Sequence, residues 1–167
     1  MKLFIFLCFF ILTNCQRNNI NKNVSGTYEI IKGKWQINED TIISLSSDEN
    51  EITFNKYFNE INFKIKFKSI SKAGIILYFQ DNEIYFEISI EDKAIYLWQR
   101  EKNNYKNIKT YSIIVIPEKE YDIKIKKSSF VLIFNFEEEE IFRIKKIEEI
   151  RKIGFKALDK DIEINLK

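Results

Sequence analysis

The sequence predicts an all-β protein built from two antiparallel sheets packed face to face. Apolar and polar side chains alternate over most of residues 26–167, as expected of strands that bury one face. Turn-forming residues recur between these runs at intervals of roughly 8 to 12 residues, which is typical of sandwiches and barrels. The composition also favours strands, because 15 Phe and 8 Tyr accompany abundant Ile, whereas Pro occurs once.

The N-terminal segment has the pattern of an export signal. Lys2 is followed by an almost unbroken apolar run from Leu3 to Leu12. A run of about ten residues has the length of a signal-peptide core, whereas a membrane-spanning helix takes about 20 residues. The run leads into Leu-Thr-Asn-Cys, ending at Cys15, which resembles the lipobox of bacterial lipoproteins of the spirochaete type, with Asn14 where Gly or Ala is commoner.

This resemblance implies that residues 1–14 are removed and that Cys15 carries a lipid. Cys8 would be lost with the signal, so the mature chain would keep one cysteine, which suits acylation and allows no internal disulfide. Residues 15–25 are polar and Asn-rich, and we expect them to form a flexible tether. The sequence therefore predicts a lipid-anchored protein of the bacterial cell envelope, on the outer-membrane, periplasmic or surface side. A plain secretory signal or an uncleaved anchor is the alternative.

Strands are expected along the whole of residues 26–167. The clearest alternation is at Phe63, Ile65 and Phe67; at Ile84, Phe86, Ile88 and Ile90; at Tyr121, Ile123 and Ile125; and at Ile162, Ile164 and Leu166. We expect turns at residues 71–74, where Gly74 stands, and at residues 117–119. The acidic run of residues 137–140 reads as a solvated hairpin turn. Residues 137–152 also show helical spacing, and a strand over residues 141–147 is equally compatible with the pattern.

The order of these segments resembles the concanavalin A-like lectin and glucanase jelly roll, including laminin G-like modules and the 3-keto-disaccharide hydrolase type of bacterial domain. The resemblance is carried by residues 33–44 (GKWQINEDTIIS), 57–68, 73–99, 121–145 and 151–167. It implies a two-sheet jelly-roll sandwich, a fold whose members include glycan binders, protein binders and enzymes. Gly33-Lys34-Trp35 also matches the opening motif of lipocalins, so a lipocalin-like barrel that carries a small ligand is the alternative fold.

Composition excludes several classes of function. The chain has no His, which removes the commonest general base and zinc ligand, together with every His-dependent triad. It shows no Gly-rich phosphate loop and no Cys-x-x-Cys motif, so we expect neither a cofactor nor a bound metal. The formal net charge is +2, and Lys and Glu are interspersed along the chain, so the sequence does not predict a basic surface for nucleic acid.

One segment contains candidate catalytic residues. Glu87-Ile88-Ser89-Ile90-Glu91 resembles the E-I-D-I-E core of retaining β-glucanases of this fold, with Ser89 in place of the central Asp. In that family the two Glu side chains act as nucleophile and acid/base, so Glu87 and Glu91 are the catalytic candidates. The simpler interpretation is a hydrated strand face that runs into a turn, and we favour a protein without catalysis.

The same region predicts a binding face. If Ile75, Leu77 and Phe79 point inward, alternation directs a row of aromatic and polar side chains to the opposite face of the sheet. Flat amphipathic rings with polar neighbours suit both sugar stacking and protein recognition. The sequence therefore predicts a non-catalytic module that binds glycan or protein, in an oligomeric state that it leaves open. The candidate ligand-binding residues are Tyr78, Gln80, Tyr85, Glu87, Tyr96, Trp98 and Arg100.

Overall fold

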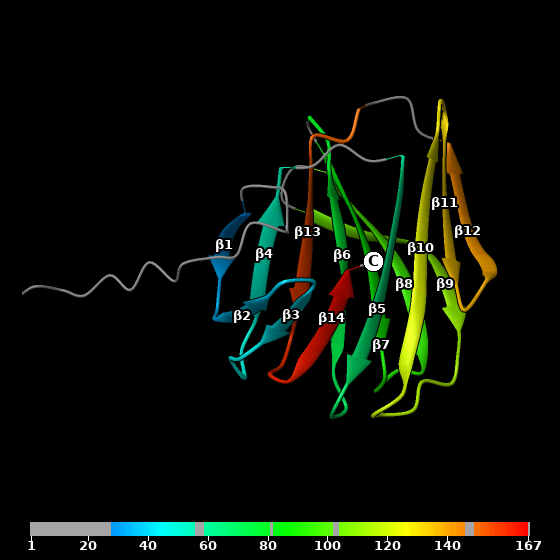
Figure 1. Cartoon of the computed structure of the whole chain (residues 1–167). Coiled ribbons are helices and arrows are strands. Elements are labelled where there is room, and N and C mark those ends of the chain that lie inside the picture. The colour runs from blue at the N-terminus through cyan, green and yellow to red at the C-terminus, as the bar shows by residue number, and fades with distance from the viewer. Residues whose placement is uncertain (1–27, 56–58, 81, 102–103, 146–148, 167) are drawn as a thin grey trace, which may run out of the picture.

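The computed structural model describes residues 28–55, 59–80, 82–101, 104–145 and 149–166. Throughout these ranges the chain forms β-strands joined by turns and loops, 14 strands in all, without a helix (Figure 1). The predicted signal over residues 1–14, the tether over residues 15–25 and Cys15 lie outside the described residues. Within the part that is described, no helix has the length and apolar character needed to span a bilayer.

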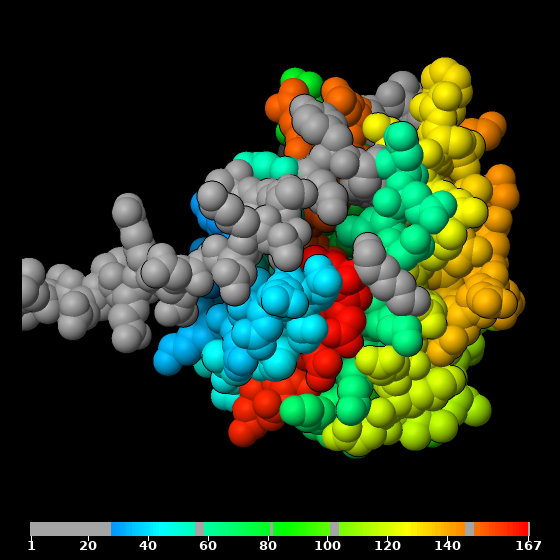
Figure 2. Space-filling model, in the orientation of Figure 1, coloured from blue at the N-terminus to red at the C-terminus, as the bar shows by residue number. Residues whose placement is uncertain are grey.

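The strands form two sheets of seven, and every pairing is antiparallel. Sheet A runs, in order, through β1 (Tyr28–Lys32), β4 (Asn50–Phe54), β13 (Lys152–Ala157), β6 (Lys72–Tyr78), β7 (Asn82–Ser89), β8 (Ala94–Glu101) and β9 (Asn104–Ser112). Sheet B runs through β12 (Glu139–Lys145), β11 (Val131–Phe136), β10 (Glu120–Ser128), β5 (Glu60–Phe67), β14 (Ile162–Leu166), β3 (Thr41–Ser44) and β2 (Trp35–Asn38). Figure 2 shows the outer face of sheet B, on which segments distant in sequence lie side by side.

This topology confirms the predicted jelly-roll sandwich and shows that the lipocalin-like barrel is wrong. A barrel closes one sheet on itself, whereas here two separate sheets each keep two edges. Side-chain donors of the edge strand β9 reach the edge strand β12 of the other sheet. The Tyr111 hydroxyl donates a hydrogen bond to Glu139 Oε1 at 2.8 Å, and Lys109 Nζ donates one to the Arg143 carbonyl oxygen at 3.1 Å.

The core lies between the sheets and follows the predicted alternation. Phe63, Ile65 and Phe67 of β5 are each at most 1% exposed, and Phe86 and Ile88 of β7 are fully buried. Aromatic rings join the two sheets: Phe86 of sheet A stacks on Phe134 of sheet B with ring centroids 5.4 Å apart. Phe155 of sheet A meets Phe63 of sheet B edge to face at 5.1 Å. Such pairs add to the stabilisation that comes from burying the rings.

Two local expectations have opposite outcomes. The acidic run does form the hairpin turn between β11 and β12, with Glu137 and Glu138 at φ values of 50° and 69°, and a strand follows it where helical spacing was noted. The expected turn at residues 71–74 is wrong, because β6 begins at Lys72 and Gly74 lies inside it. A Cβ at Gly74 would stand 1.8 Å from the Phe86 carbonyl oxygen of β7, so glycine allows β6 and β7 to approach each other closely.

Candidate functional site

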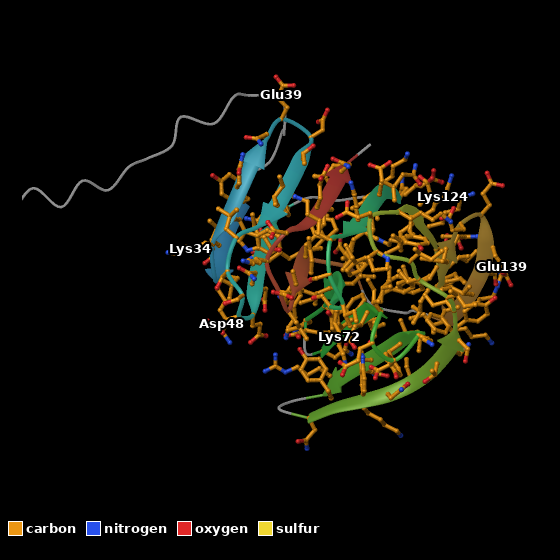
Figure 3. The ribbon with its side chains drawn as sticks, turned by 90° about the horizontal axis from the view of Figure 1, so that it is seen from below. Lys34, Glu39, Asp48, Lys72, Lys124 and Glu139 are labelled. Carbon is orange, nitrogen blue, oxygen red and sulfur yellow. The ribbon has the colours of Figure 1, made fainter. Side chains whose placement is uncertain are left out.

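The outer face of sheet A is the surface that the alternation of β6, β7 and β8 turns away from the core. Three outward side chains at its centre are buried: Ile76 is 1% exposed, Tyr85 4% and Glu87 8%. Sheet A follows a curve from β1 to β9 when it is seen from below (Figure 3). These three residues are therefore buried although they point away from the core, and we call them the floor of this face.

The register of the strands brings aromatic side chains together on this floor. Ile76, Tyr85 and Trp98 lie side by side in one row across β6, β7 and β8. Tyr96, two residues before Trp98, packs against it with ring centroids 5.4 Å apart. Tyr78 lies on the same face, and its hydroxyl donates a hydrogen bond of 2.6 Å to Glu51 Oε1. Four rings therefore lie close together on one face of the sheet.

Two polar groups on this floor are buried without a hydrogen-bond partner among the described residues. These are the Tyr85 hydroxyl and the Trp98 indole N–H. Both side chains favour the charged form of the Glu87 carboxylate and so lie near it, but neither makes a hydrogen bond of good geometry to it. Buried donors of this kind are rare in native structures, and each calls for a physical explanation. A ligand that offers acceptors at this position would supply one.

Glu87 is the buried acid of the face. Burial raises the pKa of its carboxyl above the ordinary value, and Lys72, Trp98 and Tyr85 oppose that shift. Burial also raises the pKa of the Tyr85 hydroxyl well above its usual range, so that this group stays protonated and can donate. The neighbours of Glu87 in its row are Gly74, which has no side chain, and Tyr96. Glu87 therefore has an aromatic ring beside it on one strand and no side chain beside it on the other.

A second cluster closes one end of the face. Arg100 Nη1 contacts both carboxylate oxygens of Glu83, at 3.1 and 3.3 Å, and its guanidinium lies 5.4 Å from the centroid of the Tyr105 ring. The Tyr105 hydroxyl donates to Glu83 Oε2 at 3.1 Å. Burial and the Glu83 charge raise the pKa of Tyr105 to about 12. Arg100 is therefore held by its own neighbours.

Six of the seven predicted ligand-binding residues share this face. Gln80 is the exception, because it lies beyond the end of β6, is exposed, and accepts a hydrogen bond from Arg151 Nη2 at 3.1 Å. The sequence reasoning missed Glu51 on β4 and Lys156 on β13, which occupy the row of Glu87. Lys156 forms an ion pair with Glu49, and its Nζ lies 5.8 Å from the centroid of the Tyr85 ring. The alternation of apolar and polar side chains in β4 and β13 could have predicted that Glu51 and Lys156 point outward.

The catalytic candidates do not share a strand. Strand β7 ends at Ser89, and Glu91 lies in the following turn, where its side chain is 69% exposed and 4.0 Å from Lys72. Ser89 donates a hydrogen bond to Asp92 Oδ2 at 2.8 Å and accepts one from the Asp92 backbone N–H at 3.1 Å. Ser89 is thus engaged in fixing the turn rather than in tuning a pair of carboxylates.

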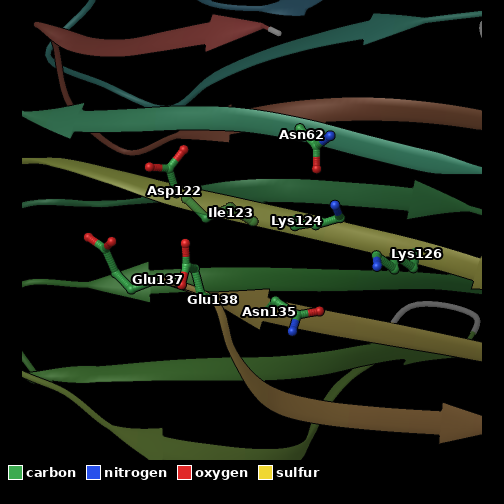
Figure 4. A pocket seen from close by; sticks show the side chains of 8 residues that line it. All are labelled: Asn62, Asp122, Ile123, Lys124, Lys126, Asn135, Glu137 and Glu138. Carbon is green, nitrogen blue, oxygen red and sulfur yellow. The ribbon is translucent and has the colours of Figure 1, made fainter.

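Sheet B carries a shallow open pocket of about 670 Å³ on its outer face (Figure 4). Acidic side chains stand at one end of the pocket and lysines at the other, with Asn62 and Asn135 on either side. No aromatic ring lines it, and Lys124 is already paired with Glu60 at 2.7 Å. It offers no surface for stacking. The residues that line it are Asn62, Asp122, Ile123, Lys124, Lys126, Asn135, Glu137 and Glu138.

Comparison with known proteins places the fold. No family model matches the sequence, and no curated protein matches it either. Solved structures do match: the carbohydrate-binding module CBM66 from Bacillus subtilis has a TM-score of 0.65 at 10% identity, over 84% of this chain and 91% of that chain. Bacillus licheniformis β-glucanase has a TM-score of 0.62 at 9% identity, over 89% of this chain and 92% of that one.

A third match is the galectin LEC-6 from Caenorhabditis elegans, with a TM-score of 0.53 at 8% identity, over 87% of this chain and 96% of that chain. These matches show that the chain has a jelly-roll sandwich fold. At such low identity they carry the fold alone, and function has to be argued from the site.

Proposed function

We propose that the protein is a glycan-binding module that holds saccharides on the outer face of sheet A. The observation that carries this proposal is the pair of buried donors without partners, the Tyr85 hydroxyl and the Trp98 indole N–H. Sugar hydroxyls accept such hydrogen bonds, and the apolar faces of sugar rings stack on flat aromatic side chains. The neighbouring Tyr78 and Tyr96 rings extend the surface available for stacking.

The structural neighbours support this proposal, because a carbohydrate-binding module and a galectin are among them. We propose binding without turnover, since Glu87 and Glu91 do not lie on one strand face. Retaining glycosidases hold their two carboxyl groups about 5–5.5 Å apart. A panel of polysaccharides should therefore show no hydrolysis, and hydrolysis that is lost in Glu87→Gln would contradict this part of the proposal.

A glycan array probed with the purified protein tests binding directly. We expect specific binding that Trp98→Ala abolishes, because the change removes both the stacking surface and a donor. Trp98→Phe keeps one six-membered aromatic ring for stacking and removes the indole N–H together with its five-membered ring, so it should weaken binding less than Trp98→Ala. Phe130→Ala is the matched control, because Phe130 is an exposed aromatic residue, 68% accessible, in the hairpin between β10 and β11 of the other sheet. A blank array, or equal loss in the control, would refute the proposal.

We also propose that the module is held at the cell envelope by a lipid on Cys15, on the basis of the apolar run and the lipobox-like segment. An anchor of this type leaves the folded part in the aqueous space beside the membrane. Mass spectrometry of the N-terminal peptide should find an acylated Cys15, and Cys15→Ser should release the protein from the membrane fraction. Cys8→Ser is the control and should remain anchored. A membrane-bound Cys15→Ser variant would exclude the lipid anchor.

A further inference from the structure

The charged side chains on the outer face of sheet A are almost all paired with one another. The strands of this sheet direct five cations to the face, and each has a carboxylate partner. The pairs are Lys72 with Asp92 at 2.8 Å, Lys152 with Glu29 at 2.9 Å, Arg100 with Glu83 at 3.1 Å, and Lys156 with Glu49. Glu49 also binds Lys32. Lys32 and Lys156 share the one carboxylate of Glu49, so five cations of this face stand against six carboxylates once Glu51 and Glu87 are included.

Two carboxylates of this face, Glu51 and Glu87, remain outside the ion pairs among the described residues. Glu51 accepts a hydrogen bond from the Tyr78 hydroxyl. Glu87 is 8% exposed and has Lys72 and Lys156 only at longer range. Burying a carboxylate without a cation is unfavourable, and an incoming positive charge would remove that cost. The centre of the face thus has an unmet requirement for a cation.

The groups around Glu87 define the rest of the ligand. The Trp98 indole N–H is a donor only and needs an acceptor, and the Tyr85 hydroxyl also lacks a partner. An ammonium group beside aromatic rings gains an additional attraction from their faces. A sugar ring that carries both hydroxyls and an ammonium group offers hydrogen-bond partners to Trp98 and Tyr85 and a positive charge to Glu87. An acidic sugar would instead place its charge beside two carboxylates.

We infer that the outer face of sheet A selects saccharides that carry a free amine, with Glu87 as the carboxylate that recognises the ammonium group. This inference rests on the proposed function and names its class of ligand. Glu87 contributes charge, and Trp98 and Tyr85 contribute hydrogen bonds to the hydroxyls of the same ring. Acetylation of the amine removes the charge, so the acetylated sugar loses the interaction with Glu87 while keeping the stacking.

Calorimetry with three oligosaccharides of matched β-1,4 linkage and length tests the inference. The probes are oligomers of glucosamine, of N-acetylglucosamine and of glucose, each titrated into the purified protein at a pH where the amines are protonated. We expect the glucosamine oligomer to bind at least about tenfold more tightly than the other two. The difference should shrink as ionic strength rises, because an ion pair at a partly open site is screened by salt.

Two variants assign the preference to a residue. Glu87→Gln should reduce the advantage of the glucosamine oligomer to less than about threefold while binding of the neutral oligomers is kept. Glu91→Gln is the matched control, because it removes a carboxylate from the exposed turn next to the face and should leave the preference intact. Glu51→Gln provides a second folded variant, with an expected effect between these two. Melting curves establish that each variant is folded.

The outcomes separate this inference from the proposed function. Equal binding of the glucose and glucosamine oligomers would overturn the amine preference and leave glycan binding in place. A preference that survives in Glu87→Gln would overturn the assignment to Glu87. Failure of all three oligomers together with a blank glycan array would refute glycan binding itself, and the inference with it.

Discussion

The outer faces of the two sheets both carry charged side chains, but they bury them to very different degrees. On sheet B, Lys64, Lys66 and Lys124 form ion pairs with glutamates at 2.7–3.0 Å, and these side chains remain between 27% and 60% exposed. On sheet A, Glu87 and Tyr85 are at most 8% exposed. Buried polar atoms without a partner among the described residues occur on both faces, at Asn62 and Asn135 on sheet B and at Tyr85 and Trp98 on sheet A. On sheet A they lie among aromatic rings, whereas no ring lines the pocket of sheet B. The comparison therefore selects sheet A without reference to any related protein.

The largest expected effect comes from a change that damages both faces together. Phe134→Ala removes a fully buried ring that stacks on Phe86 and joins the two sheets. We expect the free energy of unfolding to fall by about 3–5 kcal/mol, the usual cost of such a truncation. Urea denaturation followed by tryptophan fluorescence measures it. A loss below about 1 kcal/mol would mean that the sheets are not joined through this contact.

A smaller and pH-dependent effect is expected from Glu87. Its pKa is raised in the folded state by burial, so the folded protein holds this proton to higher pH than the unfolded chain does. The contribution of Glu87 to stability is therefore most favourable below the unfolded value of 4.5 and decreases as the pH rises toward the folded value. Glu87→Gln lacks this decrease.

The measurement is the difference in unfolding free energy between the wild type and Glu87→Gln as a function of pH. Taking the difference cancels the contributions of the other carboxylates to the pH dependence. Glu49 is one of these, and its contribution has the opposite sign because Lys156 and Lys32 lower its pKa. We expect the wild type to lose stability relative to the variant as the pH rises from acidic to neutral. A difference that does not change with pH would mean that Glu87 is solvated.

Tyr85→Phe sharpens the comparison because it should separate stability from binding. The variant removes a buried hydroxyl that has no partner among the described residues, so the free energy of unfolding should stay the same or rise by about 1 kcal/mol. Affinity for glycan should fall by roughly fivefold, since one hydrogen bond to the ligand is lost. Thermal melting and calorimetry measure the two effects. A variant that loses stability would show that the hydroxyl has a structural role.

The smallest effect is expected on sheet B. Lys64→Met breaks the exposed pair with Glu120, and we expect the Tm to change by no more than about 2 °C. Glycan binding should not change. A large loss of either property would contradict the assignment of sheet B as a solvated surface.

The sequence predicts side-chain positions correctly where the alternation within a single strand is sufficient. Alternation within β7 places Tyr85 and Glu87 on the same face, and this prediction is confirmed. Sequence reasoning failed at Gly74, because glycine is common in turns and nothing in the sequence shows that the Phe86 carbonyl oxygen lies where a Cβ would be. At Glu91 the favoured interpretation, a strand that runs into a turn, is confirmed, because β7 ends at Ser89 and Glu91 lies in the turn that follows.

The partners of Glu87 from other strands could not be predicted. Glu51 and Lys156 reach its row from β4 and β13, and only the order of the strands in sheet A brings them there. The balance of charge on this face depends on side chains from six strands. A single sequence gives the faces of its strands far more readily than their order.

The positions of β13 and β14 have a consequence for the making of the protein. These two strands are the last that the structure describes, yet β13 lies between β4 and β6 in one sheet, and β14 lies between β5 and β3 in the other. A growing chain that ends before Lys152 leaves both sheets split, with unpaired strand edges in the middle of each. The sandwich can therefore close only after synthesis has passed Leu166. Until then the chain depends on being kept apart from other exposed edges.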